Sequence, residues 1–461
     1  MFSWSYRHLP AEAARAFRLV GLHPGPDFDP YAAAALTHTG LEQAQHLLDV
    51  LARAHLVQPA GPGRYGMHDL LRAYATHLVA GEDSEEERRA ALTRLFDHYL
   101  ATAAAAMDTL HPAEQGHRPR IRPPSTPTPP VPDPLTARAW LDVELVTLTA
   151  VCAHTAARGW PGHTTGLAST LYRYLEGGGH YPDAVAIHTH ALHAARDADE
   201  PTDEAHALTN LGAVYWRQGR YGQAAEHHQQ ALTLFRELGD QAGEAHALGN
   251  LGLVHRRQGR YGQAAEHHQQ ALTLFRELGH RDGEAYVLDS LGLVYQRQGR
   301  YGQAAAHHQQ ALTLFRELGH QVGQAYAADN LGTVHQRQGR HQQAAEHHQQ
   351  ALTLYRELGH RTGEARALNG VGETHHATGH PEQAHAHHAA ALTLASQIGD
   401  RYEQARAHNG LAHIDYATGE LGQAHHHWRH ALDLYTDLGV PQADDVHAHL
   451  TALDQATGDE H

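Results

Sequence analysis

Apolar residues in the second half of the chain follow two helical patterns that alternate. The first pattern ends before Gly219 and the second before Gly239, and a glycine in that place suits a helix C-cap. Both patterns have the i, i+3, i+4, i+7 spacing of a helix with one apolar face. Each unit is therefore predicted to be a pair of helices. The apolar positions of one unit are Ala205, Leu208, Leu211 and Tyr215, then Tyr221, Ala224, Ala225, Ala231, Leu232, Phe235 and Leu238.

This unit repeats with a period of 40 residues. Residues 217–239 are identical to residues 257–279, and residues 297–319 differ from them only by Ala306 in place of glutamate. One helix pair cannot bury its apolar faces alone, whereas stacked pairs can. We therefore expect an all-α solenoid of about seven helix pairs. Its parts are a helical connector with a degenerate unit (135–202), six clear units (203–440), and a capping helix and tail (441–461).

The first 134 residues follow other patterns. Residues 1–80 are predicted to hold helices at 10–22, 30–37 and 41–54, short strands at 56–58 and 64–66 around a Pro/Gly turn, and a final helix from Leu70. Three helices followed by two short strands indicate a winged-helix module. Residues 81–110 read as a connecting helix. Residues 111–134 hold nine of the 20 prolines and are expected to be an extended linker.

The repeat resembles the tetratricopeptide consensus, in its longer Leu-Gly-Asn-type and kinesin-light-chain-type versions. The matching residues are Asn210-Leu211-Gly212, Tyr215, Tyr221, Ala224 and Ala231-Leu232. The resemblance implies the fold but not the ligand.

A second resemblance covers the parts outside the repeats. It is to actinobacterial NB-ARC (STAND-type) regulators that end in tetratricopeptide repeats, and it rests on Leu9-Pro10, Phe17-Arg18-Leu19, Leu22-His23-Pro24-Gly25, Arg64-Tyr65-Gly66-Met67-His68-Asp69-Leu70-Leu71-Arg72, Tyr74-Ala75 and Trp140-Leu141-Asp142. In that family the histidine of the Met-His-Asp motif contacts the ADP phosphate, so the resemblance implies that His68 senses the nucleotide. The family's P-loop domain has no counterpart in this sequence. His68 could therefore act in this way only if a P-loop nucleotide-binding domain were supplied. Either the chain is a truncated or split member of the family, or another polypeptide provides that domain.

Composition narrows the possible functions. The chain has no lysine, so neither a P-loop lysine nor Schiff-base chemistry is available, and no nucleophile elbow or metalloprotease motif is present. We expect no enzymatic activity, no catalytic residue and no cofactor. The formal net charge of −16 disfavours DNA as a partner. No apolar segment could cross a membrane and no signal peptide is recognisable, so a cytoplasmic protein is expected.

Four units each carry a His-His pair at the same place: His227-His228, His267-His268, His307-His308 and His347-His348. Adjacent helical residues point about 100° apart, and copies in successive units lie about 10 Å apart, too far for Zn–N bonds of about 2.0–2.1 Å. We therefore expect no metal site. One histidine of each pair is interpreted as a replacement for a packed aromatic residue and the other as solvated.

In tetratricopeptide folds the first helix of each pair lines the concave surface. The predicted groove residues are an amide series and an arginine series: Asn210, Asn250 and Asn330, with Arg217, Arg257, Arg297 and Arg337. Asparagine can both donate to and accept from a peptide backbone, and arginine can bind carboxylates in a bidentate manner. The sequence thus predicts a non-enzymatic regulatory or scaffold protein of STAND type that binds an extended, acidic peptide or protein segment. Two alternatives stay open, namely that these side chains only pair with local groups, and that the winged helix binds DNA.

Overall fold

The computed structural model describes residues 2–112, 115 and 118–458. It divides into two compact units, unit 1 up to Asp240 and unit 2 from Gln241. Apart from one small sheet, both units are helical, and the all-α tetratricopeptide solenoid predicted from the sequence is confirmed. None of the described helices is both long and apolar enough to span a membrane.

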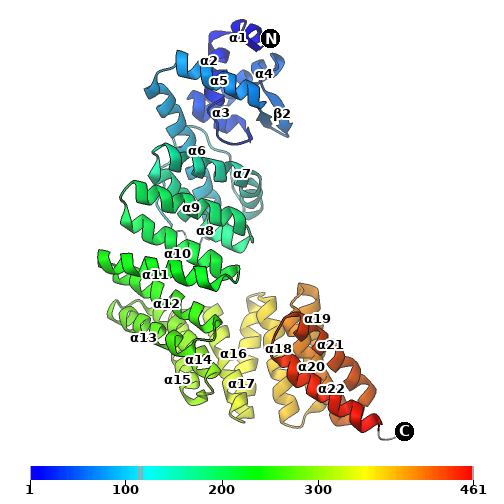
Figure 1. The fold of residues 1–461 in the computed structure, drawn as a ribbon. Coiled ribbons are helices and arrows are strands. Elements are labelled where there is room, and N and C mark those ends of the chain that lie inside the picture. The colour runs from blue at the N-terminus through cyan, green and yellow to red at the C-terminus, as the bar shows by residue number, and fades with distance from the viewer. Residues whose placement is uncertain (1, 113–114, 116–117, 459–461) are drawn as a thin grey trace. The chain divides into compact units, whose positions relative to one another are not determined.

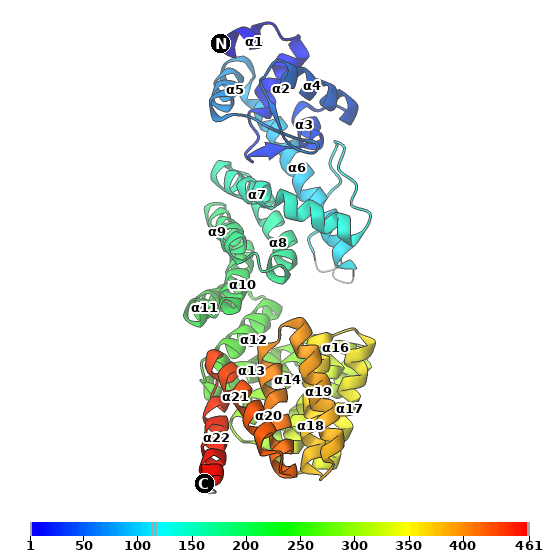
Figure 2. The ribbon, with the colours of Figure 1, turned by 90° about the vertical axis from the view of Figure 1, so that its right-hand side faces the viewer.

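Unit 1 begins with a small mixed module, which Figure 2 shows with α2 to α5 gathered around a short sheet. The sheet is antiparallel with the order β1-β3-β2, and β1, a strand of two residues, was not predicted. Its elements are α1 (Phe2–Arg7), α2 (Ala11–Val20), β1 (Asp27–Phe28), α3 (Pro30–Thr37), α4 (Leu41–Arg53), β2 (Gln58–Gly61), β3 (Arg64–Gly66) and α5 (Asp69–Glu82).

The strand predicted at 56–58 is wrong in its start, because β2 begins at Gln58. The Leu56 amide instead closes the last turn of α4 by donating to the Leu51 carbonyl at 3.0 Å. Leu56 and Val57 are both buried, so this apolar pair lies where the chain that follows α4 enters the core, before the strand begins.

Helices fill the rest of unit 1. A capping box between Ser84 and Glu87 starts α6, and residues 118–133 of the Pro-rich segment form neither helix nor strand. The helices that follow pack in sequence, α8 on α9, α9 on α10 and α10 on α11. They are α6 (Glu85–Leu110), α7 (Pro134–Arg158), α8 (Pro161–Gly177), α9 (Tyr181–Asp197), α10 (Pro201–Arg217) and α11 (Tyr221–Leu238).

The described part of unit 2 consists of five helix pairs and a final helix, α22 (Gln442–Gly458), that packs on α21 (Figure 1). We call the first helix of each pair an A helix and the second a B helix. The A helices are α12 (Gln241–Arg257), α14 (Arg281–Arg297), α16 (Gln321–Arg337), α18 (Arg361–Ala377) and α20 (Arg401–Thr418). The B helices are α13 (Tyr261–Glu277), α15 (Tyr301–Glu317), α17 (His341–Glu357), α19 (Pro381–Ile398) and α21 (Leu421–Asp437).

On four of the five A helices, α12, α14, α16 and α18, a glycine lets the B helix of the same pair approach closely. In α14 this residue is Gly292, and a Cβ atom built on it would lie 2.5 Å from Cε1 of His308 on α15. Gly252 with His268 and Gly332 with His348 repeat the arrangement. In these pairs the buried histidine therefore fills the space that the missing side chain leaves.

Candidate partner-binding groove

A groove with a volume of about 1060 Å³ runs along unit 2. Its walls come mainly from the A helices α14, α16, α18 and α20, with contributions from α12 and α22. Of the predicted site residues, Arg297, Asn330 and Arg337 line this groove.

The other predicted groove residues lie elsewhere. Asn250 and Arg257 are on α12 outside the groove lining, and the neighbouring Arg256 lines the groove instead. Asn210 and Arg217 are on α10 in unit 1, where Arg217 pairs with Glu176 at 2.9 Å. For Arg217, the alternative that these side chains only pair with local groups is therefore the one that applies.

Three arginines at one end of the groove have no counter-ion. Among the described residues, none forms a hydrogen bond or ion pair with the guanidinium of Arg256, Arg297 or Arg337. The Nε atom of Arg256 is buried and unpartnered, while Arg297 and Arg337 are exposed. Burial lowers the pKa of Arg256, and the charges of Arg257 and Arg297 lower it further, while the Asp289 carboxylate acts in the opposite direction. This end of the groove thus presents positive charge that no described carboxylate neutralises through a direct hydrogen bond or ion pair.

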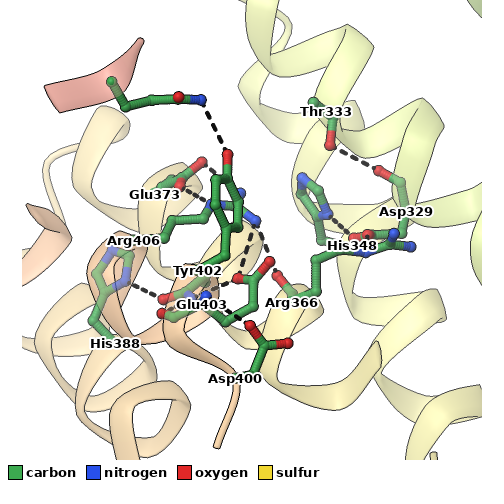
Figure 3. A network of polar contacts seen from close by, with 12 residues as sticks. Asp329, Thr333, His348, Arg366, Glu373, His388, Asp400, Tyr402, Glu403 and Arg406 are labelled. Atoms are coloured by element: carbon green, nitrogen blue, oxygen red, sulfur yellow. Dashed lines mark hydrogen bonds and ion pairs between the residues drawn. The ribbon is translucent and has the colours of Figure 1, made fainter. Parts of the chain in front are cut away.

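The arginines at the other end are neutralised (Figure 3). The Nε atom of Arg366 lies 2.5 Å from a carboxylate oxygen of Asp329, and its Nη2 donates to the Tyr355 hydroxyl at 2.9 Å. Arg406 donates to both carboxylate oxygens of Glu373, at 2.5 and 2.9 Å, and lies 3.6 Å from Glu403. The groove therefore has an open cationic end, formed by α12, α14 and α16, and a charge-compensated end, formed by α18 and α20.

Buried polar groups connect the groove floor to the B helices. Asp289 on α14 accepts from Nδ2 of Asn330 at 3.1 Å and lies 2.6 Å from Nδ1 of His308. Asp329 joins His348 and Arg366 in the same way, and Asn369 joins His388 and Glu403.

Charge governs the ionisation of the carboxylates in this network. Burial alone would raise the pKa of Asp329, but the charge of Arg366 and the hydrogen bond from His348 lower it well below its ordinary value. Burial would likewise raise the pKa of Asp289, and the charge and hydrogen bond of His308 lower it. Both carboxylates are therefore held in the charged form at neutral pH.

These bridging residues were missed in the sequence. They occupy one position of the repeat, 19 residues before the buried aromatic group, where the chain has Thr209, Gly249, Asp289, Asp329, Asn369 and Asn409. A position that is mostly polar on the buried side of a helix was the available signal. In the last pair the residue at this position is Asn409, and its side-chain oxygen accepts a hydrogen bond from Nε1 of Trp428 at 3.2 Å.

The interpretation of the His-His pairs needs one correction. The second histidine is buried, as expected, with His308 and His348 fully covered. The first is not simply solvated, because it is half-buried and stacks on an aromatic ring of the preceding A helix. His307 lies on Tyr295 with ring centroids 5.3 Å apart and an angle of 15°. The described residues include no group of three or more His, Cys, Asp or Glu side chains placed to hold a metal ion.

Two residues of the N-terminal module bear on the alternatives from the sequence. His68 is exposed at the N-cap of α5, where its Nδ1 accepts from the Leu70 amide at 3.3 Å. Arg64 lies in β3 and forms ion pairs with Asp27, at 2.5 Å, and with Glu144 of α7. The basic side chain of the hairpin is thus occupied by two carboxylates.

Comparison with known proteins agrees with the repeat assignment. The tetratricopeptide repeat family model matches residues 174–237, 243–317 and 323–397. The crystal structure of aspartyl phosphate phosphatase F from Bacillus subtilis superposes with a TM-score of 0.51 at 11% identity, over 81% of this chain and 90% of that one. At this identity the likeness concerns the fold alone.

Two regulatory proteins are similar in sequence. The regulatory protein AfsR of Streptomyces griseus is 36% identical over 224 residues, which are 48% of this chain and 22% of that protein. AfsR of Streptomyces coelicolor is 41% identical over 118 residues, 25% of this chain and 12% of that protein. The chain thus matches about a fifth of the length of the first relative and about an eighth of the second. It carries tetratricopeptide repeats and is similar, over part of its length, to AfsR-type regulatory proteins.

Proposed function

We propose that the chain is a non-enzymatic regulatory protein that captures an acidic segment of a partner protein in the groove of unit 2. The observation that carries this proposal is the contrast between the two ends of the groove. Arg366 and Arg406 are neutralised by carboxylates of the chain itself, whereas Arg256, Arg297 and Arg337 face the groove with no carboxylate of the described residues at ion-pair distance. Arg256 is partly buried, and a buried guanidinium is unfavourable unless an anion pairs with it, while the exposed Arg297 and Arg337 add positive charge beside it.

A carboxylate is the anion that suits this end best. Each guanidinium offers a planar pair of donors that matches a carboxylate in two parallel hydrogen bonds. Asn330 contributes next to them, because its Nδ2 is held by Asp289 and its amide oxygen stays available to accept from a peptide N–H. We propose Asn250 and Arg257 as flanking contacts on α12, and assign the central role to Arg256.

The alternative role in DNA binding gains no support from the N-terminal module. Arg64 is paired with Asp27 and Glu144, and α4 adds the acidic residues Glu42 and Asp49. Affinity for DNA depends on neutralising phosphates with free cations. We propose instead that this winged-helix-like module contacts protein, and that exposed His68 is the residue a P-loop polypeptide would engage through its nucleotide.

The test compares two changes of charge in neighbouring places. The double variant Arg297→Gln, Arg337→Gln removes two groove cations, and Arg300→Gln removes one cation three residues further on, outside the groove lining. Fluorescence anisotropy with a labelled glutamate-rich peptide should show a loss of at least about tenfold for the double variant and little change for Arg300→Gln. Helical circular dichroism should stay the same in both. Equal binding by the double variant and the unchanged chain would reject the groove as the binding surface.

A further inference from the structure

Two of the three groove cations are arranged with the period of the repeat. Arg297 and Arg337 occupy equivalent positions on α14 and α16, and Arg256 lies one residue before the equivalent position on α12. Neighbouring A helices are in direct contact, as the hydrogen bonds from Asn330 to Asp289 and from Gln336 to Glu373 show. Helices in contact have axes about 8–10 Å apart. Arg297 and Arg337 are therefore offered about 10 Å apart, and Arg256 follows on the next A helix, one residue out of register.

From this spacing, and building on the proposed function, we infer that the groove recognises an extended peptide with an acidic residue at every third position. An extended chain rises about 3.3 Å per residue, so residues three apart are separated by about 10 Å. In a polyproline II conformation, with three residues per turn and about 3.1 Å per residue, these side chains also point to the same side. A peptide that alternates acidic and neutral residues would place its charges only about 6.6 Å apart.

A helical ligand fits this arrangement less well. With a rise of about 1.5 Å per residue, a helix needs about seven residues to cover one interval and about fourteen to reach all three arginines. An extended segment reaches them with about seven residues.

The compensated end limits how far this pattern continues. Arg366 and Arg406 already hold Asp329, Glu373 and Glu403, so a further acidic residue of the ligand would meet carboxylates there. The segment that follows the three acidic residues is therefore neutral. Groups available to it on that side include Asn409 and His413 of α20 and Gln442 of α22, whose side-chain amide donates to the Tyr402 hydroxyl at 3.1 Å.

A protein segment is favoured over a single-stranded nucleic acid. A polyanion would be repelled by the formal net charge of −16 and by the carboxylates of the compensated end. A bound nucleic acid would also place phosphates next to the carboxylates of the compensated end, since it has a phosphate on every nucleotide. A peptide can instead place a few acidic residues only where the arginines are.

The inference is tested with synthetic peptides of equal composition and length. One has glutamate at every third position, a second has the same glutamates in alternate positions, and a third has them consecutively. Binding to the full chain is measured by fluorescence anisotropy at physiological salt, with oligo-dT as a competitor. We expect the first peptide to bind at least about tenfold more tightly than the others. This preference should disappear in Arg297→Gln and persist in Arg300→Gln.

The possible outcomes separate the two proposals. Equal affinities of the three peptides, all weakened by Arg297→Gln, would overturn the three-residue spacing and leave the acidic groove in place. Binding that Arg297→Gln does not change, or no binding of any peptide, would overturn the proposed function as well. Displacement of every peptide by oligo-dT at lower concentration than by unlabelled peptide would identify nucleic acid as the ligand and overturn both.

Discussion

Nδ1 of His348 lies 2.7 Å from the carboxylate of Asp329, and both residues are almost completely buried. The other oxygen of the same carboxylate meets Arg366 of the next A helix at 2.5 Å. One side chain thereby joins α16, α17 and α18. The equivalent links through Asp289 and Asn369 place a polar connection between successive helix pairs directly beneath the groove.

We predict that Asp329→Asn destabilises unit 2 by about 3 kcal/mol, because removing one partner of a buried ion pair leaves Arg366 uncompensated. The thermal midpoint of the full chain, followed by circular dichroism, measures the effect. Asp445→Asn is the matched control, since Asp445 is exposed and also lines the groove. A fall in the midpoint no larger for Asp329→Asn than for the control would contradict the structural role of this carboxylate.

The same substitution should have opposite effects at two glycines of neighbouring helices. A Cβ atom on Gly292 would lie 2.5 Å from the ring of buried His308, so Gly292→Ala should cost about 1–3 kcal/mol. Gly302 in α15 has open space around it, and Gly302→Ala should stabilise by about 0.5–1 kcal/mol. Chemical denaturation of the two variants measures both signs. A stabilising Gly292→Ala would show that the close approach of the helices is not needed.

Stability should decrease in mild acid because buried histidines are held neutral. Burial lowers the pKa of His228 to about 4, of His268 to about 3 and of His388 to about 4. Below about pH 6.5 the unfolded chain binds protons that the folded chain does not, so stability is lost as the pH falls from about 6.5 to about 4. Each group contributes up to about 1.4 kcal/mol per pH unit in this range.

Thermal midpoints measured between about pH 7.5 and pH 5 test this expectation. The His268→Leu variant should show a shallower decline than the unchanged chain, because it lacks one of the groups that protonate on unfolding. The same slope in both proteins would exclude His268 as a contributor.

The hairpin arginine offers a test of the DNA alternative. Because Arg64 is engaged by Asp27 and Glu144, the chain should not shift duplex DNA in a gel at physiological salt. Glu144→Gln, which releases one of these partners, serves as the comparison. A salt-sensitive shift that Arg64→Gln abolishes would establish the hairpin as a DNA contact.

Features that depend on local spacing could be predicted from the sequence, and features that depend on contacts between helices could not. The helix pairs follow from apolar positions and glycine ends within about 20 residues, as at Gly219 and Gly239. The strand β1 has only two residues, Asp27 and Phe28, too few to form a pattern. Asp329 resembles a solvated residue until the partner helix brings His348 to it.

The groove residues illustrate the limit within a single helix. Arg256 and Arg257 are adjacent, and a helix turns by about 100° per residue. A small error in the predicted orientation of α12 therefore assigns the wrong one of the two arginines to the groove. The sequence favoured Arg257 because it is the repeat equivalent of Arg297 and Arg337. In the structure the groove is lined by Arg256.

This pair provides the last prediction, because the two arginines differ in environment but not in charge. Arg256 faces the groove with a buried, unpartnered Nε, whereas Arg257 is exposed on the same turn. Arg256→Gln should weaken binding of the glutamate peptide by about tenfold, the value of one charge-assisted hydrogen bond of about 1.4 kcal/mol or more. Arg257→Gln should weaken it by about twofold at most, as expected for a solvent-screened charge.

The effect on stability should run the other way. Without a ligand, Arg256 is a partly buried cation whose pKa is lowered, because desolvation and the charges of Arg257 and Arg297 outweigh the attraction of Asp289. Its removal should therefore raise the thermal midpoint of the free chain while lowering its affinity for the peptide, as found where a binding site is kept at a cost to stability. Anisotropy and thermal melting on the two single variants measure both quantities. If Arg256→Gln destabilises the free chain and leaves the affinity unchanged, Arg256 has a structural role and the cationic end of the groove is not the binding site.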